Sequence, residues 1–216
     1  MILGLCLILS VALAYGDMCG CRKHPQELVC DADFVIKGKI LSREITSPSR
    51  YRKVANYKVD VLVVFKGNDV ITTGHQIISR RWAGKCQLEV GKKYLITGDK
   101  SWQQLQSEDC QWIVKWRDLT SFQKQGLTDA YTDNCHTCRI TTDIVKVAIG
   151  RLPVGPLISS RGNECVFQYG TDRGRERAAG KSCVRGCEGQ RGCSWVLNSE
   201  YEPCSNDDSF PELLIN

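Results

Sequence analysis

The chain has 216 residues, of which 13 are Cys, and a formal charge of +5 at pH 7. This cysteine density argues against a reducing compartment, where disulfides do not persist. The small positive charge favours polyanions such as matrix glycosaminoglycans only weakly, and we expect neither nucleic-acid binding nor membrane insertion. The length suffices for one large domain or two small ones.

An apolar run over residues 2–14 opens the chain. At about 13 residues it is too short to span a bilayer and is typical of a signal-peptide core. We therefore predict that residues 1–18 are a signal peptide and that the mature protein is secreted into the extracellular space and matrix. Removal of Cys6 with the leader reduces 13 cysteines to 12, an even number that indicates disulfides throughout.

Two segments of the first half alternate apolar and polar residues, which predicts half-buried strands. In DFVIKGKIL, residues 33–41, Gly38 lies on the apolar face and indicates a bulge or a sharp bend. The polar segment 47–56 is predicted to be an exposed hairpin loop. In ANYKVDVLVVF, residues 55–65, the predicted inward face consists of Tyr57, Val59, Val61, Val63 and Phe65.

Three shorter β-rich runs follow at residues 74–82, 92–100 and 110–116. Residues 119–134 then show helical spacing, with Thr120 placed as an N-cap. The apolar positions of this predicted helix are Leu119, Phe122, Leu127, Ala130 and Tyr131. Five strands and a helix, closed by cysteines, predict a mainly β protein built on a small antiparallel barrel such as the OB-fold.

The sequence changes character after Cys138. Residues 150–163 are rich in Pro and Gly, and four cysteines crowd into residues 183–204. We therefore predict a domain boundary near Cys135 to Cys138, followed by a small disulfide-rich subdomain.

Common enzyme signatures are absent, since the chain has no HExxH, no GxSxG and no phosphate-binding loop. The CHTC sequence from Cys135 to Cys138 imitates a redox motif. Redox pairs need a helix N-terminus to lower the thiol pKa, however, and this pair follows the predicted helix. We therefore predict that the protein is not an enzyme.

Candidate metal ligands are also better explained in other ways. Scattered histidines are typical of surface or hydrogen-bonded side chains, and here they are His24, His75 and His136. Clustered cysteines in a secreted chain favour disulfides over zinc, and here they are Cys183, Cys187 and Cys193.

The first cysteines after the leader form the pattern CGCRKHPQELVC at residues 19–30. Cys19 and Cys21 are too close in sequence to bond to each other without severe strain, so both must reach distant partners. Such bonds clamp the N-terminus, either as reinforcement or to present a rigid binding edge. Spacing alone does not identify the partners.

The sequence CGCRKHPQELVCDADFVIKGKI resembles the start of the tissue inhibitors of metalloproteinases, the TIMP family. The likeness continues at YKVDVLVVFKG, VGKKYLITG and DCQWIVKWRDLTSFQKQGL and covers nearly all of residues 19–138. It is weaker in the C-terminal half, where ECVFQYG and GCSWV resemble family segments. The resemblance implies an OB-like, five-stranded netrin-like barrel with flanking helices over residues 19–135. A disulfide-rich C-terminal subdomain would then occupy residues 136–216.

The resemblance also implies a set of disulfides. Those of the first domain are Cys19–Cys86, Cys21–Cys110 and Cys30–Cys135. Those of the second are Cys138–Cys193 and Cys165–Cys183. Cys187 and Cys204 are extra relative to the family pattern, and we predict that they pair with each other. The two cysteines of CHTC then belong to different bonds, which removes the redox interpretation.

A member of this family is expected to inhibit secreted or membrane-anchored zinc metalloproteases in a 1:1 complex. The resemblance implies that the α-amine and carbonyl oxygen of Cys19 chelate the catalytic zinc of the protease, so that the inhibitor needs no cofactor of its own. An α-amine titrates near about 7.7–8.0 and is a better zinc ligand than an amide nitrogen. The implied protease-binding residues are Cys19, Gly20, Cys21, Arg22, Ala83, Gly84, Lys85 and Cys86.

Gly20 departs from the family pattern, which usually has Thr or Ser at the second position of the mature chain. That side chain points into the main specificity pocket of the protease, so a glycine leaves the pocket unfilled and adds backbone freedom. The departure predicts weaker or shifted inhibition of matrix metalloproteinases.

Two alternatives stay open in the sequence. Leader rules favour cleavage after Ala14 or Gly16, whereas zinc chelation requires cleavage after Met18. The alternative function is a non-inhibitory netrin-like module that binds matrix or signalling partners, and retention of Asp17 with Met18 would favour it.

Overall fold

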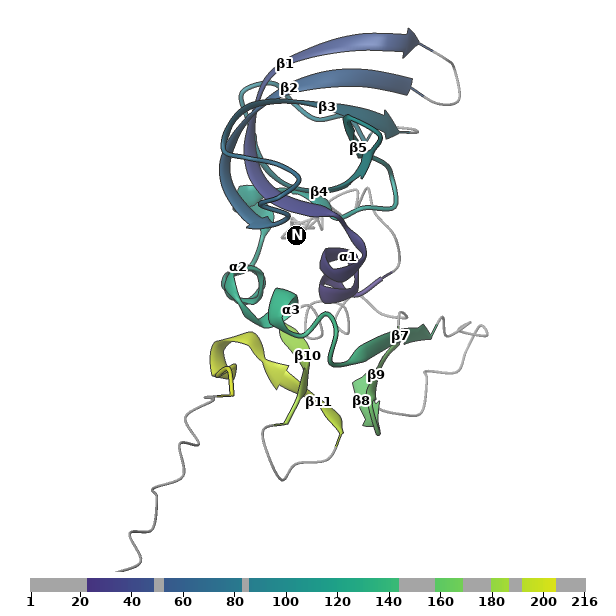
Figure 1. Ribbon diagram of the computed structural model, residues 1–216, viewed down its shortest axis with the longest axis vertical. Helices are drawn as coiled ribbons and strands as arrows, with labels where there is room; N and C mark the ends of the chain where they lie inside the picture. The colour runs from purple at the N-terminus through teal and green to yellow at the C-terminus, as the bar shows by residue number, and fades with distance from the viewer. Residues whose placement is uncertain are drawn as a thin grey trace, which may run out of the picture.

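Figure 1 shows the computed structural model, which describes residues 23–48, 53–82, 86–143, 158–168, 180–186 and 192–204. The first half of the chain forms a six-stranded sheet. Its strands are β1 (Phe34–Pro48), β2 (Lys53–Lys66), β3 (Gly74–Trp82), β4 (Lys93–Ser101), β5 (Gln104–Ser107) and β6 (Ile113–Lys115). The protein is mainly β, as predicted.

The sheet closes into a five-stranded barrel because β4 pairs with β1 as well as with β5. The ring runs in the order β1-β2-β3-β5-β4, and antiparallel pairing from Phe34 with Gly98 to Lys39 with Lys93 completes it. Closure removes the exposed edges that an open sheet would present. A side chain at Gly98 would collide with the ring of Phe34 and the carbonyl oxygen of Gln106, so the closing contact requires glycine there.

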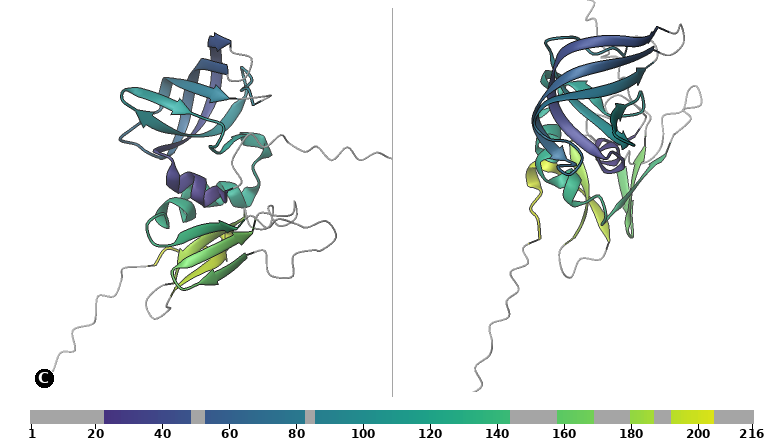
Figure 2. Two further views of the ribbon diagram at one scale, coloured as in Figure 1. Left: turned by 90° about the vertical axis from the view of Figure 1, so that its right-hand side faces the viewer. Right: turned by 45° about the horizontal axis from the view of Figure 1, so that its top comes forward.

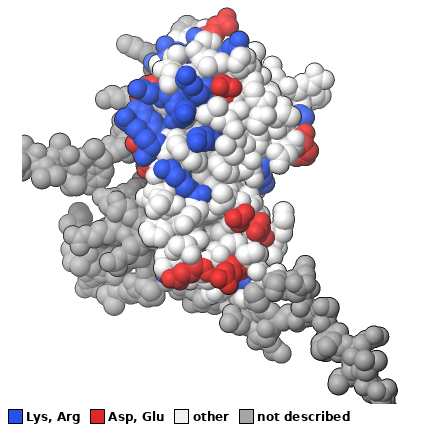
Figure 3. Space-filling view, turned by 90° about the vertical axis from the view of Figure 1, so that its left-hand side faces the viewer, with Lys and Arg blue, Asp and Glu red and all other residues white. Residues whose placement is uncertain are grey.

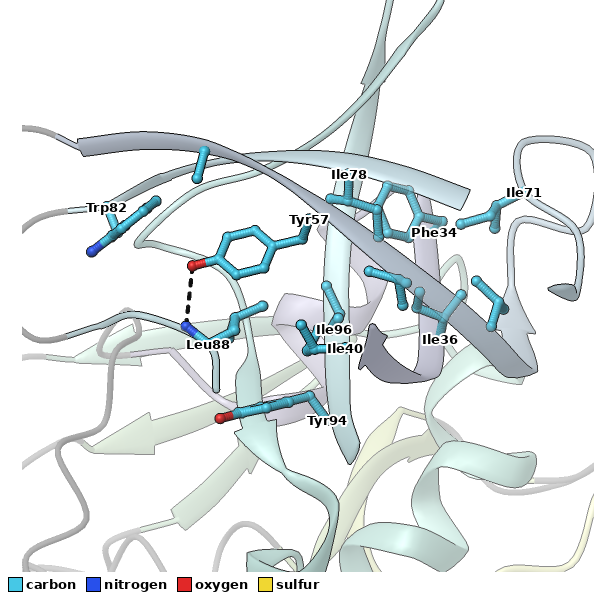
Figure 4. Close-up of a cluster of buried hydrophobic side chains, with 13 residues drawn as sticks. Phe34, Ile36, Ile40, Tyr57, Ile71, Ile78, Trp82, Leu88, Tyr94 and Ile96 are labelled. Carbon is cyan, nitrogen blue, oxygen red and sulfur yellow. Dashed lines mark hydrogen bonds between the residues drawn. The ribbon is translucent and has the colours of Figure 1, made fainter. Parts of the chain in front are cut away.

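Apolar side chains from the surrounding strands fill the barrel (Figure 4). The hydroxyl of Tyr57 accepts a hydrogen bond from the Leu88 N–H at 3.3 Å, which fixes the segment between β3 and β4 against the barrel. Each large side chain buried in this way stabilises the fold by about 1.5–3 kcal/mol. The fully enclosed members of the cluster include Phe34, Ile36, Ile40, Tyr57, Val59, Ile78, Trp82 and Ile96.

A bulge in β2 changes the predicted inward face. Gly38 pairs with Val61, whereas the residue before Gly38 pairs with Val63, so that Leu62 has no partner in β1. The extra residue reverses the alternation of side chains. Val63 is therefore 38% exposed, and Phe65 packs in a second apolar cluster. The prediction that both face the barrel interior is wrong, although the irregularity expected at Gly38 is present.

The strand predictions need two further corrections. The segment 47–56 is not one loop, because β1 continues to Pro48 and β2 begins at Lys53. The fifth member of the ring is β5, which the sequence did not predict. The predicted run 110–116 instead contains β6, which pairs with β4 outside the ring.

Helices α1 (Pro25–Asp31), α2 (Ser121–Thr128) and α3 (Ala130–Asp133) lie between the barrel and the C-terminal strands (Figures 1 and 2). Thr120 caps α2 as predicted. The single helix predicted over residues 119–134 is instead two helices, because α2 ends before Asp129 and α3 begins after it. Helix α1 was not predicted. The helices enclose the second apolar cluster, made of Leu28, Val29, Ala32, Val35, Leu95, Trp112, Leu119, Leu127 and Tyr131. Phe122, predicted to share this face, is instead 44% exposed.

Two small sheets form the described C-terminal part. One contains β7 (Arg139–Asp143), β9 (Glu164–Gln168) and β8 (Ile158–Arg161), and the other pairs β10 (Lys181–Arg185) with β11 (Cys193–Leu197). Short 3-10 turns occur at η1 (Trp116–Asp118) and η2 (Asn198–Glu200). None of the helices in the described part of the chain has the length and apolar character needed to cross a bilayer.

Three disulfides lie within the described residues: Cys30–Cys135, Cys138–Cys193 and Cys165–Cys183. These are the same pairs that the resemblance implies. The two cysteines of CHTC belong to different bonds, which excludes a redox dithiol. The sulfur atoms of Cys138, Cys183 and Cys193 lie within 4.8 Å of one another, but all three are consumed in disulfides and offer no thiolate to a metal.

Buried hydrogen bonds join the helices to the C-terminal sheets. The Gln26 side chain donates to the Cys183 carbonyl at 2.9 Å and accepts from the Cys183 N–H at 2.7 Å. The Asn198 side chain donates to the Phe122 carbonyl at 2.8 Å and to the Tyr131 hydroxyl at 3.0 Å. The helices and the C-terminal part of the chain thus supply hydrogen-bond partners to each other.

Candidate functional site

The ends of β3 and β5 define one edge of the barrel. The two strands are parallel, with Arg80 opposite Ser107, so both end at the same side. Cys86 follows β3 and Cys110 follows β5. Both cysteines are disulfide-bonded, and neither bond is to another described cysteine. This edge therefore carries two covalent attachment points side by side.

The buried side chain of Arg80 connects the segments that carry these two cysteines. Its Nε and Nη2 donate to the Cys86 carbonyl at 3.4 and 3.2 Å. Its Nη1 donates to the Glu108 carbonyl at 3.0 Å and to the Ser107 hydroxyl at 3.3 Å. One guanidinium thus fixes the spacing between the backbone at Cys86 and the backbone just before Cys110.

Burial lowers the pKa of the Arg80 guanidinium, and the Asp109 carboxylate, 3.6 Å from Nη2, opposes that shift. An arginine keeps its charge even so, because its pKa starts far above neutral. Sequence reasoning did not single out Arg80. The available signal was the alternation in β3, which places Arg80 on the same inward face as Ile78 and Trp82.

The N-terminal end of the described chain approaches this edge. Lys23 forms ion pairs with Glu27 at 3.1 Å and Asp31 at 2.6 Å, and the hydrogen bond to Asp31 raises the Lys23 pKa. Lys23 and Cys110 line a common hollow of about 220 Å³. Lys23, the first described residue, therefore lies near Cys110.

Buried contacts hold the next residue, His24, in place. Its ring is fully buried and lies edge-on to Trp195 and Phe167, with centroids 4.8 and 5.4 Å apart. Its Nδ1 accepts a hydrogen bond from the Gln26 N–H at 3.2 Å, which caps α1. At the other end of α1, the Lys66 ammonium donates to two carbonyls. His24 is thus a hydrogen-bonded core residue, one of the two interpretations preferred from the sequence.

Most of the predicted protease-binding residues fall outside the described part of the chain. Cys86 is described, half-buried and disulfide-bonded. The predicted bonds Cys19–Cys86, Cys21–Cys110 and Cys187–Cys204 each have one member outside the described residues. The remaining predicted binding residues, also outside them, are Cys19, Gly20, Cys21, Arg22, Ala83, Gly84 and Lys85.

A basic surface covers part of the barrel, where Lys and Arg side chains gather (Figure 3). Lys39 on β1 lies directly opposite Lys93 on β4. The ammonium groups of Lys37 and Lys124 lie over the Trp116 ring, 4.3 and 5.5 Å from its centroid. The contacts of Lys37 and Lys124 with the ring are attractive. Like charges directly opposite each other on a sheet are destabilising, so sheet pairing does not explain the facing pair of Lys39 and Lys93.

Comparison with known proteins places these features in one family. The sequence model of the family described as "Tissue inhibitor of metalloproteinase" matches residues 17–150. Metalloproteinase inhibitor 2 of Bos taurus is 29% identical over 203 residues, which cover 88% of this chain and 86% of that protein. The human metalloproteinase inhibitor 2 is 30% identical over 202 residues, with 88% and 86% covered. Metalloproteinase inhibitor 3 of Gallus gallus is 26% identical over 189 residues, with 83% and 82% covered.

Proposed function

Because the chain belongs to the tissue inhibitor of metalloproteinase family, we propose that it inhibits zinc metalloendopeptidases and is not itself an enzyme. The proposed inhibitory edge comprises the N-terminal segment from Cys19, the segment from Ala83 to Cys86, and Cys110. The protease contributes the zinc, and the inhibitor has no cofactor of its own. We propose secretion and a 1:1 complex with secreted or membrane-anchored proteases.

The single observation that carries this proposal is the pair of disulfide-bonded cysteines, Cys86 and Cys110, at one barrel edge. Cys21 precedes Lys23 by two residues, so at most about 7 Å of extended chain separates them. Since Lys23 and Cys110 line one hollow, a Cys21–Cys110 bond is within reach. A Cys19–Cys86 bond then fits the neighbouring position, which Arg80 holds at a fixed spacing.

The proposed mechanism follows from the chemistry of a free N-terminus. A catalytic zinc with three protein ligands keeps a position for water. The neutral α-amine of Cys19 and its carbonyl oxygen would occupy that position as a five-membered chelate. The two disulfides would hold this wedge before the complex forms, so that less conformational entropy is lost on binding.

The test of the proposal is the state of the bond between Met18 and Cys19. N-terminal sequencing of the secreted protein is expected to read Cys19 first. A variant that retains Met18 is expected to lose at least a hundredfold in inhibition constant, because its amine is displaced from the zinc. Equal inhibition by both forms, or a secreted chain that begins at Asp17, would overturn the chelation mechanism and leave the fold unaffected.

The basic surface supports a second candidate function, binding to matrix glycosaminoglycans. Heparin affinity is expected to fall steeply with salt, because the contacts are between exposed charges. The double variant Lys39→Gln with Lys93→Gln should elute from heparin at lower salt, whereas Lys181→Gln in the C-terminal sheet should not. Heparin binding together with no inhibition of any metalloproteinase would favour the alternative netrin-like binding module.

A further inference from the structure

The hairpin between β4 and β5 has an unusual residue at its tip. Ser101 pairs with Gln104, so Trp102 and Gln103 form a two-residue turn. Trp102 has φ +57°, and it is the only non-glycine with positive φ among the described residues. Two-residue hairpins with positive φ at the first turn position prefer glycine there. The backbone at Trp102 is therefore strained.

The side chain of Trp102 does not compensate for that strain by packing against the rest of the fold. It is 95% exposed, whereas the other tryptophans of the described chain are buried or half-buried. An indole in water makes no contribution through burial. Neither backbone preference nor packing therefore explains a tryptophan at this turn.

The described residues that line the surface beside Trp102 are polar and uncharged apart from the indole, and Asp99 lies directly opposite Gln106 on β4. The lining residues form an open hollow of about 600 Å³. Its lining residues are Ser101, Trp102, Gln103, Gln104 and Gln106. Among the described residues that line it, none is Lys, Arg, Asp or Glu. No hydrogen bond within the described chain engages any of the three glutamine side chains.

The amides stand in a row beside the indole. Along β5, Leu105 and Ser107 face the barrel, so Gln104 and Gln106 face outward. Two residues of a strand advance about 7 Å, which sets the spacing of the two amides. A carboxamide offers both donors and acceptors, and an exposed indole offers a flat apolar face.

We infer that this hairpin, the β4–β5 turn with Gln104 and Gln106, binds a neutral saccharide. A sugar ring has an apolar face of C–H groups that stacks on an indole, and hydroxyls that both donate and accept hydrogen bonds. The row of amides matches those hydroxyls. Sulfated or acidic sugars need Lys or Arg, which are not among the described lining residues of this hollow and which the basic surface of Figure 3 provides.

The Trp102 end of the saccharide site lies away from the proposed inhibitory edge, whereas Gln106, at its other end, directly precedes Ser107. Trp102 precedes Ser107, where β5 ends near that edge, by five residues, about 17 Å of extended strand. Substitutions at Trp102 are therefore expected to leave protease inhibition unchanged.

The first experiment follows the tryptophan indole N–H signals by NMR while neutral trisaccharides of glucose, mannose, galactose and N-acetylglucosamine are added. At least one trisaccharide should shift the Trp102 signal saturably at millimolar concentration.

Trp102→Gly should weaken that binding about tenfold or more and should not lower the melting temperature, because glycine relieves the strain. Trp102→Tyr should keep part of the binding. Val90→Ala, a change at another exposed apolar residue, should change nothing.

The second experiment separates two sources of the same chemistry. A glycoprotein with neutral glycans is tested before and after enzymatic removal of the glycans, beside the free trisaccharides. Loss of binding after removal identifies a protein-borne glycan, and binding to the free sugar alone identifies an oligosaccharide. Either of two results of the first experiment overturns the inference: no trisaccharide shifts the Trp102 signal, or Trp102→Gly binds as well as wild type. Binding that is restricted to sulfated sugars, or to the protein after its glycans are removed, also overturns it.

Discussion

A buried arginine needs a partner for most of its N–H groups, because each unsatisfied donor costs free energy. In this barrel the Arg80 guanidinium meets that need with backbone carbonyls from two separate segments. The hydrogen bonds that satisfy the buried Arg80 guanidinium therefore also set the distance between Cys86 and the chain leading to Cys110.

Replacement of Arg80 should show this positioning role. Arg80→Met is expected to lower the free energy of unfolding by about 2–4 kcal/mol, because carbonyls at Cys86 and Glu108 lose their donor. Arg81→Met is the matched control. Its ion pair with Glu108 is half-exposed and is expected to contribute less than about 1 kcal/mol. Chemical denaturation with inhibition assays on the folded fraction measures both effects, and equal results for the two variants would contradict the role.

Gly20 offers a second test at the residue scale, and it rests on the proposed function. Gly20→Thr is expected to tighten inhibition of matrix metalloproteinases about tenfold, because the threonine side chain fills the specificity pocket. The same substitution in a chain that retains Met18 should gain nothing. Inhibition constants across a protease panel measure the effect. Wild type already as tight as the variant across the panel would refute the argument from an empty pocket.

At the scale of elements, the capping box of α2 is a local test of how sequence starts a helix. Thr120→Ala removes the acceptor for the Gln123 N–H and should cost about 1 kcal/mol. Thr128→Ala removes a threonine from the exposed end of the same helix and should cost less than about 0.5 kcal/mol. Thermal denaturation of both variants decides whether the loss of stability comes from the cap or from the removal of any threonine in this helix.

The sequence predicted those elements whose side chains carry a clear period. β3 and β4 match their predicted runs closely, and Thr120 caps α2 as expected. β5 was missed because its four residues, QLQS, are mostly polar and its register depends on partners distant in sequence. The bulge at Leu62 was also invisible, since only pairing with β1 reveals the unpaired residue.

The candidate site also has features that the sequence reveals and features that depend on partners distant in sequence. The cysteine pattern and the family resemblance indicate where covalent clamps belong, because cysteines are recognisable in any context. Arg80 could have been noticed as a charge on an inward face. Its partners could not, because the carbonyls at Cys86 and Glu108 come together only when β3 and β5 lie parallel.

At the scale of the whole molecule, polar contacts fix how the two halves meet. Apolar surfaces alone would tolerate sliding, whereas the paired hydrogen bonds of Gln26 with Cys183 specify one arrangement. His24 caps the N-terminus of α1 and also packs against Trp195, so the start of α1 rests on the C-terminal sheets. We propose that the two halves unfold as one cooperative unit.

Gln26→Ala tests that coupling. It leaves the Cys183 N–H and carbonyl without their partner and should lower the free energy of unfolding by about 2–4 kcal/mol. Gln125→Ala, on the exposed face of α2, should change it by less than about 0.5 kcal/mol. Differential scanning calorimetry should give one transition for wild type. Two separated transitions in wild type would contradict the cooperative unit.

The Cys30–Cys135 bond has a consequence for a protein that works among proteases. It joins α1 to the residue just beyond α3 and encloses a loop of 105 residues that contains the whole barrel. A protease that cuts any connection within this loop opens the backbone once but releases no fragment. The nicked molecule stays in one piece, with its strands still paired, until a reductant separates the halves. Damage to such an inhibitor would leave its mass on a non-reducing gel unchanged.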